Sequence, residues 1–287
     1  MWREGNYEGK RPLLYLVATP IGNLQEFTPR AIEILKQMDY IACEDTRNSG
    51  LLFSKFDIKK PLISCHEHNE EEASDKIISL LKEGKKVAYT SDAGYPTVSD
   101  PGSRLSKRCI EEGIKVAVIN GPSASLCALA GSAIDTSHYY FEGFLPAKES
   151  ERNKELADLK RRKETIIFYE SPHRIGKTLK AIASSLGENR NACLCRELTK
   201  LHEEYIHATL GELASIDENS LLGEMVIIVE GSKNSEKELS DEEIISLLKE
   251  YALKMRGKEA VNKIAKENAI PKNRVYDIYL SIKKDEN

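Results

Sequence analysis

Three segments of the 287-residue chain combine small residues, turn formers and groups able to bind a ligand. They are Thr19-Pro20-Ile21-Gly22-Asn23, Ser91-Asp92-Ala93-Gly94-Tyr95-Pro96 with the following Ser99-Asp100-Pro101-Gly102, and Asn120-Gly121-Pro122-Ser123-Ala124-Ser125. Each follows a short apolar run typical of a strand, and ligands of open α/β sheets bind where parallel strands end. One such segment alone is most simply a tight turn. Three together favour a small-molecule site.

A second set of segments places arginine or lysine beside carboxylates. These segments are Glu44-Asp45-Thr46-Arg47, Glu170-Ser171-Pro172-His173-Arg174 and Arg196-Glu197-Leu198-Thr199-Lys200. Any one of them can be a structural ion pair. Their repetition favours a crevice whose cations hold the phosphates of a large anionic substrate, despite a formal net charge of −4.

The glycines argue against two common nucleotide sites. No two of the 17 glycines are one residue apart, which excludes the Gly-x-Gly-x-x-Gly turn of dinucleotide-binding folds and the Gly-x-Gly loop of ordinary Rossmann-type methyltransferases. Gly176-Lys177-Thr178 resembles the end of a phosphate-binding loop, but Ser171 stands where that loop needs its first glycine. We expect these residues to form the first turns of a helix.

The histidines and cysteines predict no metal site. Cys65-His66-Glu67-His68 has no second ligand pair at zinc spacing, and His202 and His207 miss the i, i+4 spacing of a zinc-binding helix by one residue. Six cysteines without a Cys-x-x-Cys pair are too sparse for a disulfide scaffold and favour a reducing cytoplasm. Cys193 and Cys195 are expected on one face of a buried strand.

In the first half of the chain, strand patterns alternate with helix patterns. Strands are predicted at 13–18, 40–43, 87–90 and 116–119, and helices at 28–38 and 70–82. Thr28 is the expected N-cap of the first helix, with Pro29 at its first position. The alternation predicts an α/β domain with a parallel sheet over residues 12–134.

From about residue 135 the strand patterns come closer together. Strands are predicted at 138–143, 164–169, 192–196, 204–210 and 224–230. Connections as short as 197–203 leave no room for a helix, so we expect hairpins and a mixed sheet in a second domain over 135–234. The strongly charged segment 148–163 is either a solvated helix or a mobile arm.

The last segment, residues 235–287, consists of an acidic part followed by a basic part. Residues 236–250 hold six acids and two lysines, whereas residues 251–284 hold nine basic residues and three acids. Helices predicted at 241–255, 258–267 and 272–283 are compatible with a helix-turn-helix, with Lys272 and Arg274 opening the last one. Its basic face either contacts RNA or is the solvated face of a small capping bundle.

The composition is that of a soluble globular protein, with 40% hydrophobic and 31% charged residues. No apolar run approaches the ~20 residues that a membrane-spanning helix needs. The first residues contain no apolar segment that would mark the chain for secretion. We therefore expect a cytoplasmic protein without a membrane partner.

Over residues 12–234 these motifs, in this order, resemble the bacterial 16S ribosomal RNA (cytidine-2'-O)-methyltransferases of the tetrapyrrole (corrin/porphyrin) methylase superfamily. His66-Glu67-His68-Asn69 and Gly223-Glu224 extend the resemblance, and the basic C-terminal helices resemble the family's terminal helix-turn-helix. Tyr95 departs from the pattern, because the family usually has threonine before the proline. The change affects the pocket wall rather than the class of chemistry.

The resemblance implies a two-domain tetrapyrrole-methylase-like fold, with a parallel-sheet N-terminal domain, a mixed-sheet second domain and a small C-terminal helical segment. It also implies S-adenosylmethionine in the cleft between the domains, no metal, and a homodimer. By analogy with the superfamily, the cofactor contacts fall on Ile21, Gly22, Ser91, Asp92, Ala93, Val98, Ser123 and Ala124.

The implied reaction is 2'-O-methylation of a decoding-centre cytidine of 16S rRNA in the 30S subunit. Transfer from a sulfonium is an in-line displacement, so the protein must align the ribose oxygen and accept its proton. Candidate catalytic groups are Glu44, Asp45, Glu170, Glu197 and Lys200. Candidate substrate-binding groups are Arg47, Arg174, Arg196, Lys272 and Arg274. Because a 2'-hydroxyl distinguishes RNA from DNA, no DNA partner is expected.

Two other functions stay open. A tetrapyrrole C-methyltransferase would share the superfamily, but Thr-Pro-Ile-Gly-Asn and Ser-Asp-Ala replace its glycine-rich first loop and Gly-Asp-Pro motif. A non-catalytic RNA-binding or ribosome-assembly factor would use the basic C-terminal helices and retain the cleft only as scaffold. Both methyltransferases must bind S-adenosylmethionine, whereas a non-catalytic factor needs no methyl donor, so a binding measurement distinguishes them.

Overall fold

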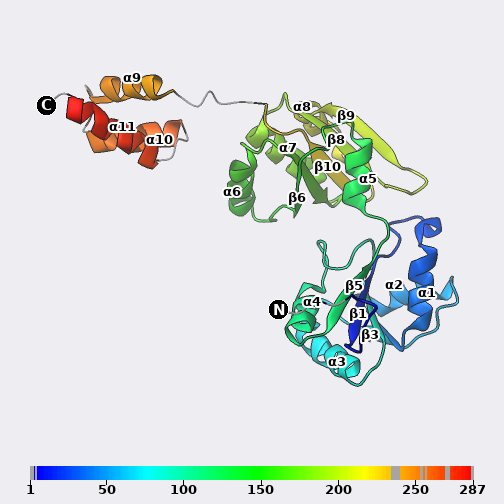
Figure 1. The fold of residues 1–287 in the computed structure, drawn as a ribbon. Helices are drawn as coiled ribbons and strands as arrows, with labels where there is room; N and C mark the ends of the chain where they lie inside the picture. The colour runs from blue at the N-terminus through cyan, green and yellow to red at the C-terminus, as the bar shows by residue number, and fades with distance from the viewer. Residues whose placement is uncertain are drawn as a thin grey trace. The chain divides into compact units, whose positions relative to one another are not determined.

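The structure is a computed structural model that describes residues 3, 5–233, 240–252, 255, 257–268 and 272–285. The chain divides into two compact units, Met1–Gly231 and Ser232–Asn287. The first unit contains two five-stranded sheets (Figure 1). No helix among the described residues is long and apolar enough to cross a membrane.

The first sheet is parallel, with the strand order β3-β2-β4-β1-β5. Its strands are β1 (Leu13–Val17), β2 (Tyr40–Cys43), β3 (Leu62–Ser64), β4 (Val87–Thr90) and β5 (Lys115–Ile119). The predicted parallel sheet is therefore confirmed. Strand β3 was not predicted, because a three-residue run carries too little pattern to separate it from a loop.

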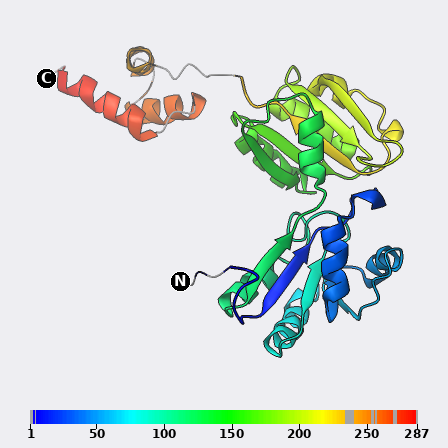
Figure 2. The same ribbon diagram turned by 45° about the vertical axis from the view of Figure 1, so that its right-hand side comes forward.

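Helices cover both faces of this sheet (Figures 1 and 2). One face packs on α1 (Pro29–Gln37) and α2 (Thr46–Ser54), and the other on α3 (Glu70–Lys82) and α4 (Ser103–Glu111). Short 3-10 turns lie at Leu24–Glu26 (η1) and Glu218–Ser220 (η2). The N-cap of α1 is Thr28, as predicted, and its hydroxyl accepts the backbone N–H of Ala31 at 3.1 Å.

The second sheet is mixed, with the strand order β6-β7-β10-β8-β9. Strands β6 and β7 run parallel, and the remaining neighbours run antiparallel, as the short connections predicted. The strands are β6 (Tyr139–Phe144), β7 (Thr165–Glu170), β8 (Asn191–Arg196), β9 (Glu204–Thr209) and β10 (Met225–Val229).

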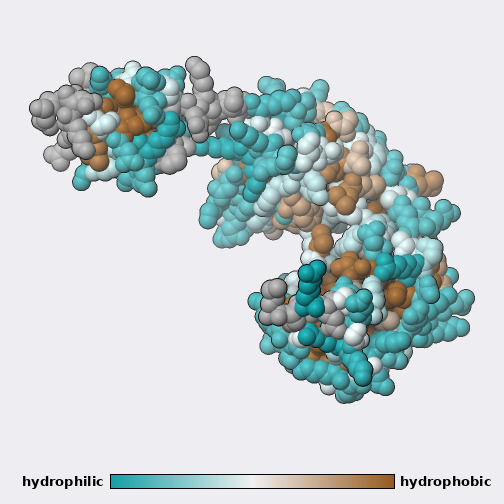
Figure 3. Space-filling model, in the orientation of Figure 1, coloured by the Kyte–Doolittle hydropathy of each residue, from teal (hydrophilic) through white to brown (hydrophobic). Residues whose placement is uncertain are grey.

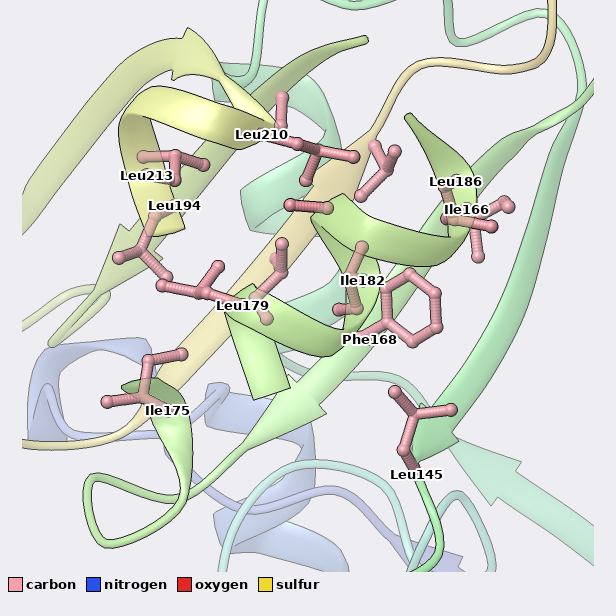
Figure 4. Close-up of a cluster of buried hydrophobic side chains, with 14 of the residues drawn as sticks. Leu145, Ile166, Phe168, Ile175, Leu179, Ile182, Leu186, Leu194, Leu210 and Leu213 are labelled. Carbon is pink, nitrogen blue, oxygen red and sulfur yellow. The ribbon is translucent and has the colours of Figure 1, made fainter. Parts of the chain in front are cut away.

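One face of the second sheet packs on α6 (Glu149–Leu159), α7 (Ile175–Leu186) and α8 (Leu210–Ala214). Their leucine and isoleucine side chains interlock with those of the strands to form the apolar cluster drawn in Figure 4. Of the two alternatives for segment 148–163, the structure has the helix. Helix α6 buries Leu156 and Leu159, so it is a packed element of this core.

The opposite face packs on α5 (Ala124–Gly131). Cys193 and Cys195 lie together on this face, as predicted, with their Sγ atoms 3.7 Å apart. Helix α5 directly follows β5 of the first sheet yet packs on the second sheet (Figures 1 and 2). The loop between β5 and α5 therefore lies where the two halves of this unit meet.

The second unit consists of α9 (Asp241–Ala252), α10 (Gly257–Glu267) and α11 (Lys272–Asp285) in its described part. They pack around an apolar cluster that includes Ile244, Val261 and Val275. Lys272 and Arg274 open α11 as predicted, and Arg274 forms an ion pair of 2.9 Å with Asp241. The three predicted helices are confirmed, but Met255, the predicted last residue of the first helix, is not helical; residues 253 and 254 lie outside the described residues.

Candidate active site

A cavity of about 330 Å³ lies between the loops of the first sheet and the strand ends of the second. This volume is within the ~300–1,000 Å³ typical of small-molecule sites. The first half lines it with Ile21, Ala93, Gly94, Tyr95, Val98, Ser99, Asp100, Ser123 and Ala124. The second half lines it with Phe144, Tyr169, Glu170, Ser171, Pro172, Leu198, Glu224, Met225 and Val226. Figure 3 shows hydrophobic surface where these halves meet.

The three small-residue loops are tied to one another by their backbones. Thr19 and Gly94 exchange two backbone hydrogen bonds of 2.9 and 3.0 Å, and the Thr19 hydroxyl donates to the carbonyl of Ser91 at 3.2 Å. A Cβ on Gly121 would lie 2.8 Å from the Cβ of Ala18, so glycine permits the third loop to approach the first. All three loops consequently meet at one cavity.

Five of the eight residues predicted to contact a cofactor line the cavity, namely Ile21, Ala93, Val98, Ser123 and Ala124. Gly22, Ser91 and Asp92 lie in the same loops outside its lining. Asp92 accepts the backbone N–H of Asp45 at 3.3 Å and the Asn48 side-chain amide at 3.2 Å. Its carboxylate thus joins the loop after β4 to the start of α2.

Tyr95, the departure from the family pattern, has a structural role in the cavity wall. Its hydroxyl accepts the backbone N–H of Gly121 at 3.1 Å and donates to the side-chain carbonyl of Asn120. The ring lines the cavity. Tyr95 therefore connects two of the three loops, which a threonine side chain is too short to do in the same way.

The segment between β4 and α4 has an unusual backbone. Thr97 and Ser99 have φ angles of +75° and +61°, and Gly102 has +111°. Positive φ is costly for a β-branched residue such as threonine and persists only where the surroundings enforce it. The buried Glu70 holds the C-terminal end of this segment, because its Oε1 accepts the backbone N–H groups of Gly102 and Arg104 at 3.0 Å each.

Asp100 lines the cavity from this segment. Burial and then the charge of Glu44 raise its pKa to about 6, against the opposing effect of the hydrogen bond from the Ser91 hydroxyl. Burial, followed by the charge of Asp92, also raises the pKa of Glu44, which lies outside the cavity lining. Asp100 was not among the predicted site residues, although the Ser99-Asp100-Pro101-Gly102 motif was a signal for it in the sequence.

Of the predicted catalytic residues, Glu170 alone lines the cavity, and it is 3% exposed. Its Oε1 accepts the backbone N–H of Ser171 at 2.8 Å, and its Oε2 accepts the Thr178 hydroxyl at 2.6 Å. Arg174 lies 3.3 Å from the same Oε2 and donates to the carbonyl of Leu145 at 2.7 Å. Glu170 and Arg174 therefore hold the turn between β7 and α7.

Glu197 and Lys200 belong to an ion-pair network at the start of the β8–β9 hairpin. Lys200 Nζ lies 3.0 Å from carboxylate oxygens of both Glu197 and Glu224. The hydrogen bond from Lys200 lowers the pKa of Glu197. Burial acts to lower the pKa of Lys200, but its bonds to the two carboxylates raise it above the ordinary value. Lys200 is therefore a cation near neutral pH.

The remaining predicted residues differ in how firmly they are held. Asp45 is the N-cap of α2 and accepts the N–H of Arg47 at 2.8 Å, which lowers the pKa of Asp45. The Arg47 side chain is 91% exposed, and its ion pair with Asp45 is 3.7 Å long. Arg196 instead forms an ion pair of 2.9 Å with Glu204. Lys272 and Arg274 belong to the other unit.

The second half also contributes an aromatic wall that sequence analysis missed. Tyr169 packs edge to face against Phe141 and Phe144, with ring centroids 5.1 and 5.7 Å apart. Its hydroxyl accepts the backbone N–H of Ser125 at 3.1 Å, linking β7 to the start of α5. In the sequence these aromatic residues are indistinguishable from ordinary strand core.

Among the described residues, no group of three or more histidine, cysteine, aspartate or glutamate side chains is placed to hold a metal ion. All six cysteines are free, and Cys127 is the one that is not fully buried.

Residues 13–214 match the family model of Tetrapyrrole (Corrin/Porphyrin) Methylases. The chain belongs to this family. Solved structures of similar fold include a cobalt precorrin-4 methyltransferase of cobalamin biosynthesis, which is 19% identical, with a TM-score of 0.57 over 76% of this chain and 94% of that one. Diphthine synthase is 14% identical, with a TM-score of 0.58 over 76% of this chain and 89% of that one. These likenesses confirm the predicted fold class.

Closer relatives of this tetrapyrrole methylase carry the name ribosomal RNA small subunit methyltransferase I. The Bacillus subtilis protein is 44% identical over 96% of this chain and 98% of its own length. The Haemophilus influenzae protein is 43% identical, covering 94% and 96% of the two chains. These matches extend well beyond residue 214, where the match to the family model ends. The chain is thus a methyltransferase of this narrower family as well.

Proposed function

We propose that the protein transfers a methyl group from S-adenosylmethionine to the ribose 2'-oxygen of a decoding-centre cytidine in 16S rRNA of the 30S subunit. The observation that carries this proposal is the 43–44% identity, over nearly the whole chain, to proteins named ribosomal RNA small subunit methyltransferase I. The choice of nucleotide and of oxygen rests on the family resemblance of the motifs. In this proposal the protein acts in the cytoplasm as a homodimer.

The proposed division of labour follows three parts of the chain. Residues 12–134 supply cofactor and substrate loops, residues 135–234 close the cleft, and residues 235–287 provide an auxiliary RNA contact through Lys272 and Arg274. The net positive charge of residues 251–284 supports the last assignment, because cationic side chains bind the phosphate backbone.

The cavity lining suits a donor that is partly apolar and carries positive charge. Small residues such as Ala93 and Ser123 allow a ligand to approach backbone groups closely. The aromatic rings of Phe144 and Tyr169 attract a cation on their faces, and the carboxylates of Asp100 and Glu224 attract it electrostatically. When bound, S-adenosylmethionine supplies an activated methyl group. The protein then has to orient the acceptor oxygen and exclude water.

The arginines fit different parts of this function. Arg47 is exposed and loosely paired, so its guanidinium is available to a phosphate group. Arg174 and Arg196 are committed to shorter contacts with Glu170, Leu145 and Glu204. We therefore assign substrate phosphate binding first to Arg47, and we assign to Arg174 and Arg196 mainly the support of the strand ends.

The test is transfer of labelled methyl groups from S-adenosylmethionine to 30S subunits that lack the modification, followed by nucleoside analysis. Labelled 2'-O-methylcytidine is the expected product. Label on a base, or on another nucleoside, contradicts the proposal. Binding of the donor without transfer to RNA favours a tetrapyrrole C-methyltransferase. Neither binding nor transfer favours the non-catalytic RNA-binding factor.

A further inference from the structure

We propose that Glu44 selects the acceptor nucleotide by accepting a hydrogen bond from the exocyclic amino group of cytosine. This assignment rests on the proposed function and adds to it the residue that recognises the base. Glu44 directly follows β2, at the carboxyl ends of the parallel strands, where α/β sheets bind their ligands. It lies outside the lining of the proposed methyl-donor cavity.

The strand order of the first sheet places a second polar region beside the cavity. The cavity is lined by loops that follow β1, β4 and β5. Strand β5 is an edge strand, so within the described sheet the row of strand ends continues past β4 to β2 and β3. Cys43, the last residue of β2, pairs with both Thr90 of β4 and Ser64 of β3. Glu44, the next residue, therefore lies between the cavity loops and the end of β3.

The shape of a nucleotide fits this arrangement. The 2'-oxygen must meet the methyl group in the cavity, and the base is attached to the neighbouring carbon of the same ribose. The base of a correctly placed nucleotide therefore lies at the border of the cavity. Glu44 is near that border, because its charge acts on Asp100 in the lining.

The carboxylate of Glu44 is available to a ligand. It is half-buried, and it accepts no hydrogen bond from any residue that the structure describes. Its neighbours are engaged, because Asp45 caps α2 and Asp92 accepts hydrogen bonds from Asp45 and Asn48. A partly desolvated carboxylate forms a stronger hydrogen bond with a ligand than a carboxylate in open water does. Glu44 therefore has the acceptor capacity that base recognition requires.

His66 is a second polar group at this end of the sheet. It follows β3, the neighbour of β2, and it is close enough to Glu44 to oppose the rise in the pKa of Glu44 that burial and then the charge of Asp92 cause. The Nδ1 atom of His66 is buried without a hydrogen-bond partner among the described residues. Because buried polar atoms are normally paired, this imidazole is not committed to the protein's own hydrogen bonds. Adjacent strands thus present an unengaged carboxylate and an unengaged imidazole.

Base selection by Glu44 follows from the hydrogen-bonding groups of the pyrimidines. Cytosine carries an amino group at the position where uracil carries a carbonyl oxygen. A carboxylate accepts a hydrogen bond from the amino group, whereas it meets the uracil oxygen as one acceptor against another. Arg47, three residues further on, is exposed and loosely paired, and it fits a phosphate of the same nucleotide. One short segment thus offers groups for both the base and the backbone.

The test measures single-turnover methyl transfer to two forms of 30S subunits that lack the modification, one with the acceptor cytidine and one with uridine in its place. We expect wild type to prefer cytidine by roughly 10- to 100-fold, the usual discrimination of one specific base contact. Glu44→Gln should reduce this preference to below about 3-fold, because an amide can present either its oxygen or its amino group. Affinity for S-adenosylmethionine, measured by calorimetry, should stay unchanged.

Two further variants separate base selection from a structural role. Glu72→Gln, at an exposed carboxylate in the first turn of α3, is the matched control and should keep the wild-type preference on the same subunits. Glu44→Ala removes the carboxylate without supplying an amide. It should slow transfer to cytidine and leave the slow transfer to uridine nearly unchanged, whereas a structural defect slows both reactions by the same factor.

Three results overturn the assignment while leaving the proposed function intact. They are equal rates of the wild-type protein on the two forms of subunit, an unchanged cytidine preference in Glu44→Gln, and loss of donor binding in that variant. Absence of transfer by the wild-type protein to the cytidine form is a different failure, because it removes the proposed function and the assignment together.

Discussion

The first-sheet side of the cavity consists of loops, whereas the second-sheet side consists of strand ends and their side chains. On the first side, position is fixed by backbone contacts such as the paired hydrogen bonds of Thr19 and Gly94. On the second side it is fixed by side chains, with Glu170 and Arg174 at one strand end and Lys200 in an ion-pair network at another. We therefore expect added atoms to destabilise the first side and removed charges to destabilise the second side.

The difference also separates two kinds of function. Loops of small residues let a ligand reach the backbone. The strained backbone between β4 and α4 places the Asp100 side chain in the cavity lining. Strand ends supply the apolar and aromatic surface of Tyr169 and Met225, which needs no special backbone. We therefore expect substitutions in the first-sheet loops and at the second-sheet strand ends to have different effects.

The largest expected effect is that of Gly102→Ala. The new Cβ would lie 2.5 Å from the buried Tyr89 ring, and the residue would keep a φ of +111°. We expect a loss of about 2–4 kcal/mol in the free energy of unfolding, from backbone strain together with overpacking. Urea denaturation measures this loss.

Gly84→Ala is the matched control for this substitution. Gly84 also has a positive φ, of +83°, but a Cβ there would have no heavy atom within 4 Å. The control should lose only the strain contribution, about 1 kcal/mol. Equal losses at the two glycines would show that close packing does not fix the first-sheet side.

A smaller effect is expected for Arg174→Ala on the second-sheet side. Removing this guanidinium leaves the fully buried Glu170 carboxylate without its cation, which should cost about 1–3 kcal/mol of unfolding free energy. Arg47→Ala, at a 91% exposed side chain, should change stability by less than about 0.5 kcal/mol but weaken binding to 30S subunits. If the two variants exchange these phenotypes, the assignment of structural and substrate arginines is wrong.

Asp100→Asn should stabilise the protein at neutral pH. The pKa of Asp100 is raised from 3.8 to about 6 in the folded state, so between these values the folded protein binds more protons than the unfolded chain. Stability therefore falls as the pH rises through this window. Removing the charge should add on the order of 1 kcal/mol at pH ~7 and nothing below pH ~4. Urea denaturation at both pH values measures this difference. If Asp100→Asn is less stable than wild type at neutral pH, the pKa of Asp100 is not raised by folding.

The smallest effect concerns a region outside both walls. Lys272→Ala should leave stability and donor binding unchanged and reduce by about 1 the slope of log affinity for 30S subunits against log salt concentration. Lys249→Ala, an exposed lysine in the acidic helix α9, should leave that slope unchanged. An equal slope for wild type, Lys272→Ala and Lys249→Ala would show that Lys272 does not contribute to RNA binding.

Much of the fold was predictable because local signals agreed with the global arrangement. The Thr28 cap and Pro29 marked the start of α1 directly, and the short 197–203 connection predicted the β8–β9 hairpin. Strand β3 was not predicted, because its three residues pair with β2 through contacts distant in sequence. The packing of α5 on the second sheet likewise depends on tertiary structure.

In the candidate site, too, some residues were predictable from the sequence and others were not. Turn residues made the first-sheet loops visible in the sequence, so residues such as Ile21, Ala93 and Ser123 could be selected before the structure was known. Tyr169 carried no such signal, because in sequence it is one more apolar strand residue. Asp100 was visible as part of a motif, but its raised pKa arises from burial and from neighbours on other elements.

The most direct test of the proposed methyl-donor site is a calorimetric titration of a cavity-filled variant with S-adenosylmethionine. Ala124→Phe places a large ring in the lining at the start of α5, and Ala157→Phe, at an exposed position in α6, is the matched control. We expect wild type and the control to bind the donor equally, whereas the folded Ala124→Phe variant should lose binding. Equal binding by all three proteins would contradict the assignment of this cavity as the methyl-donor site.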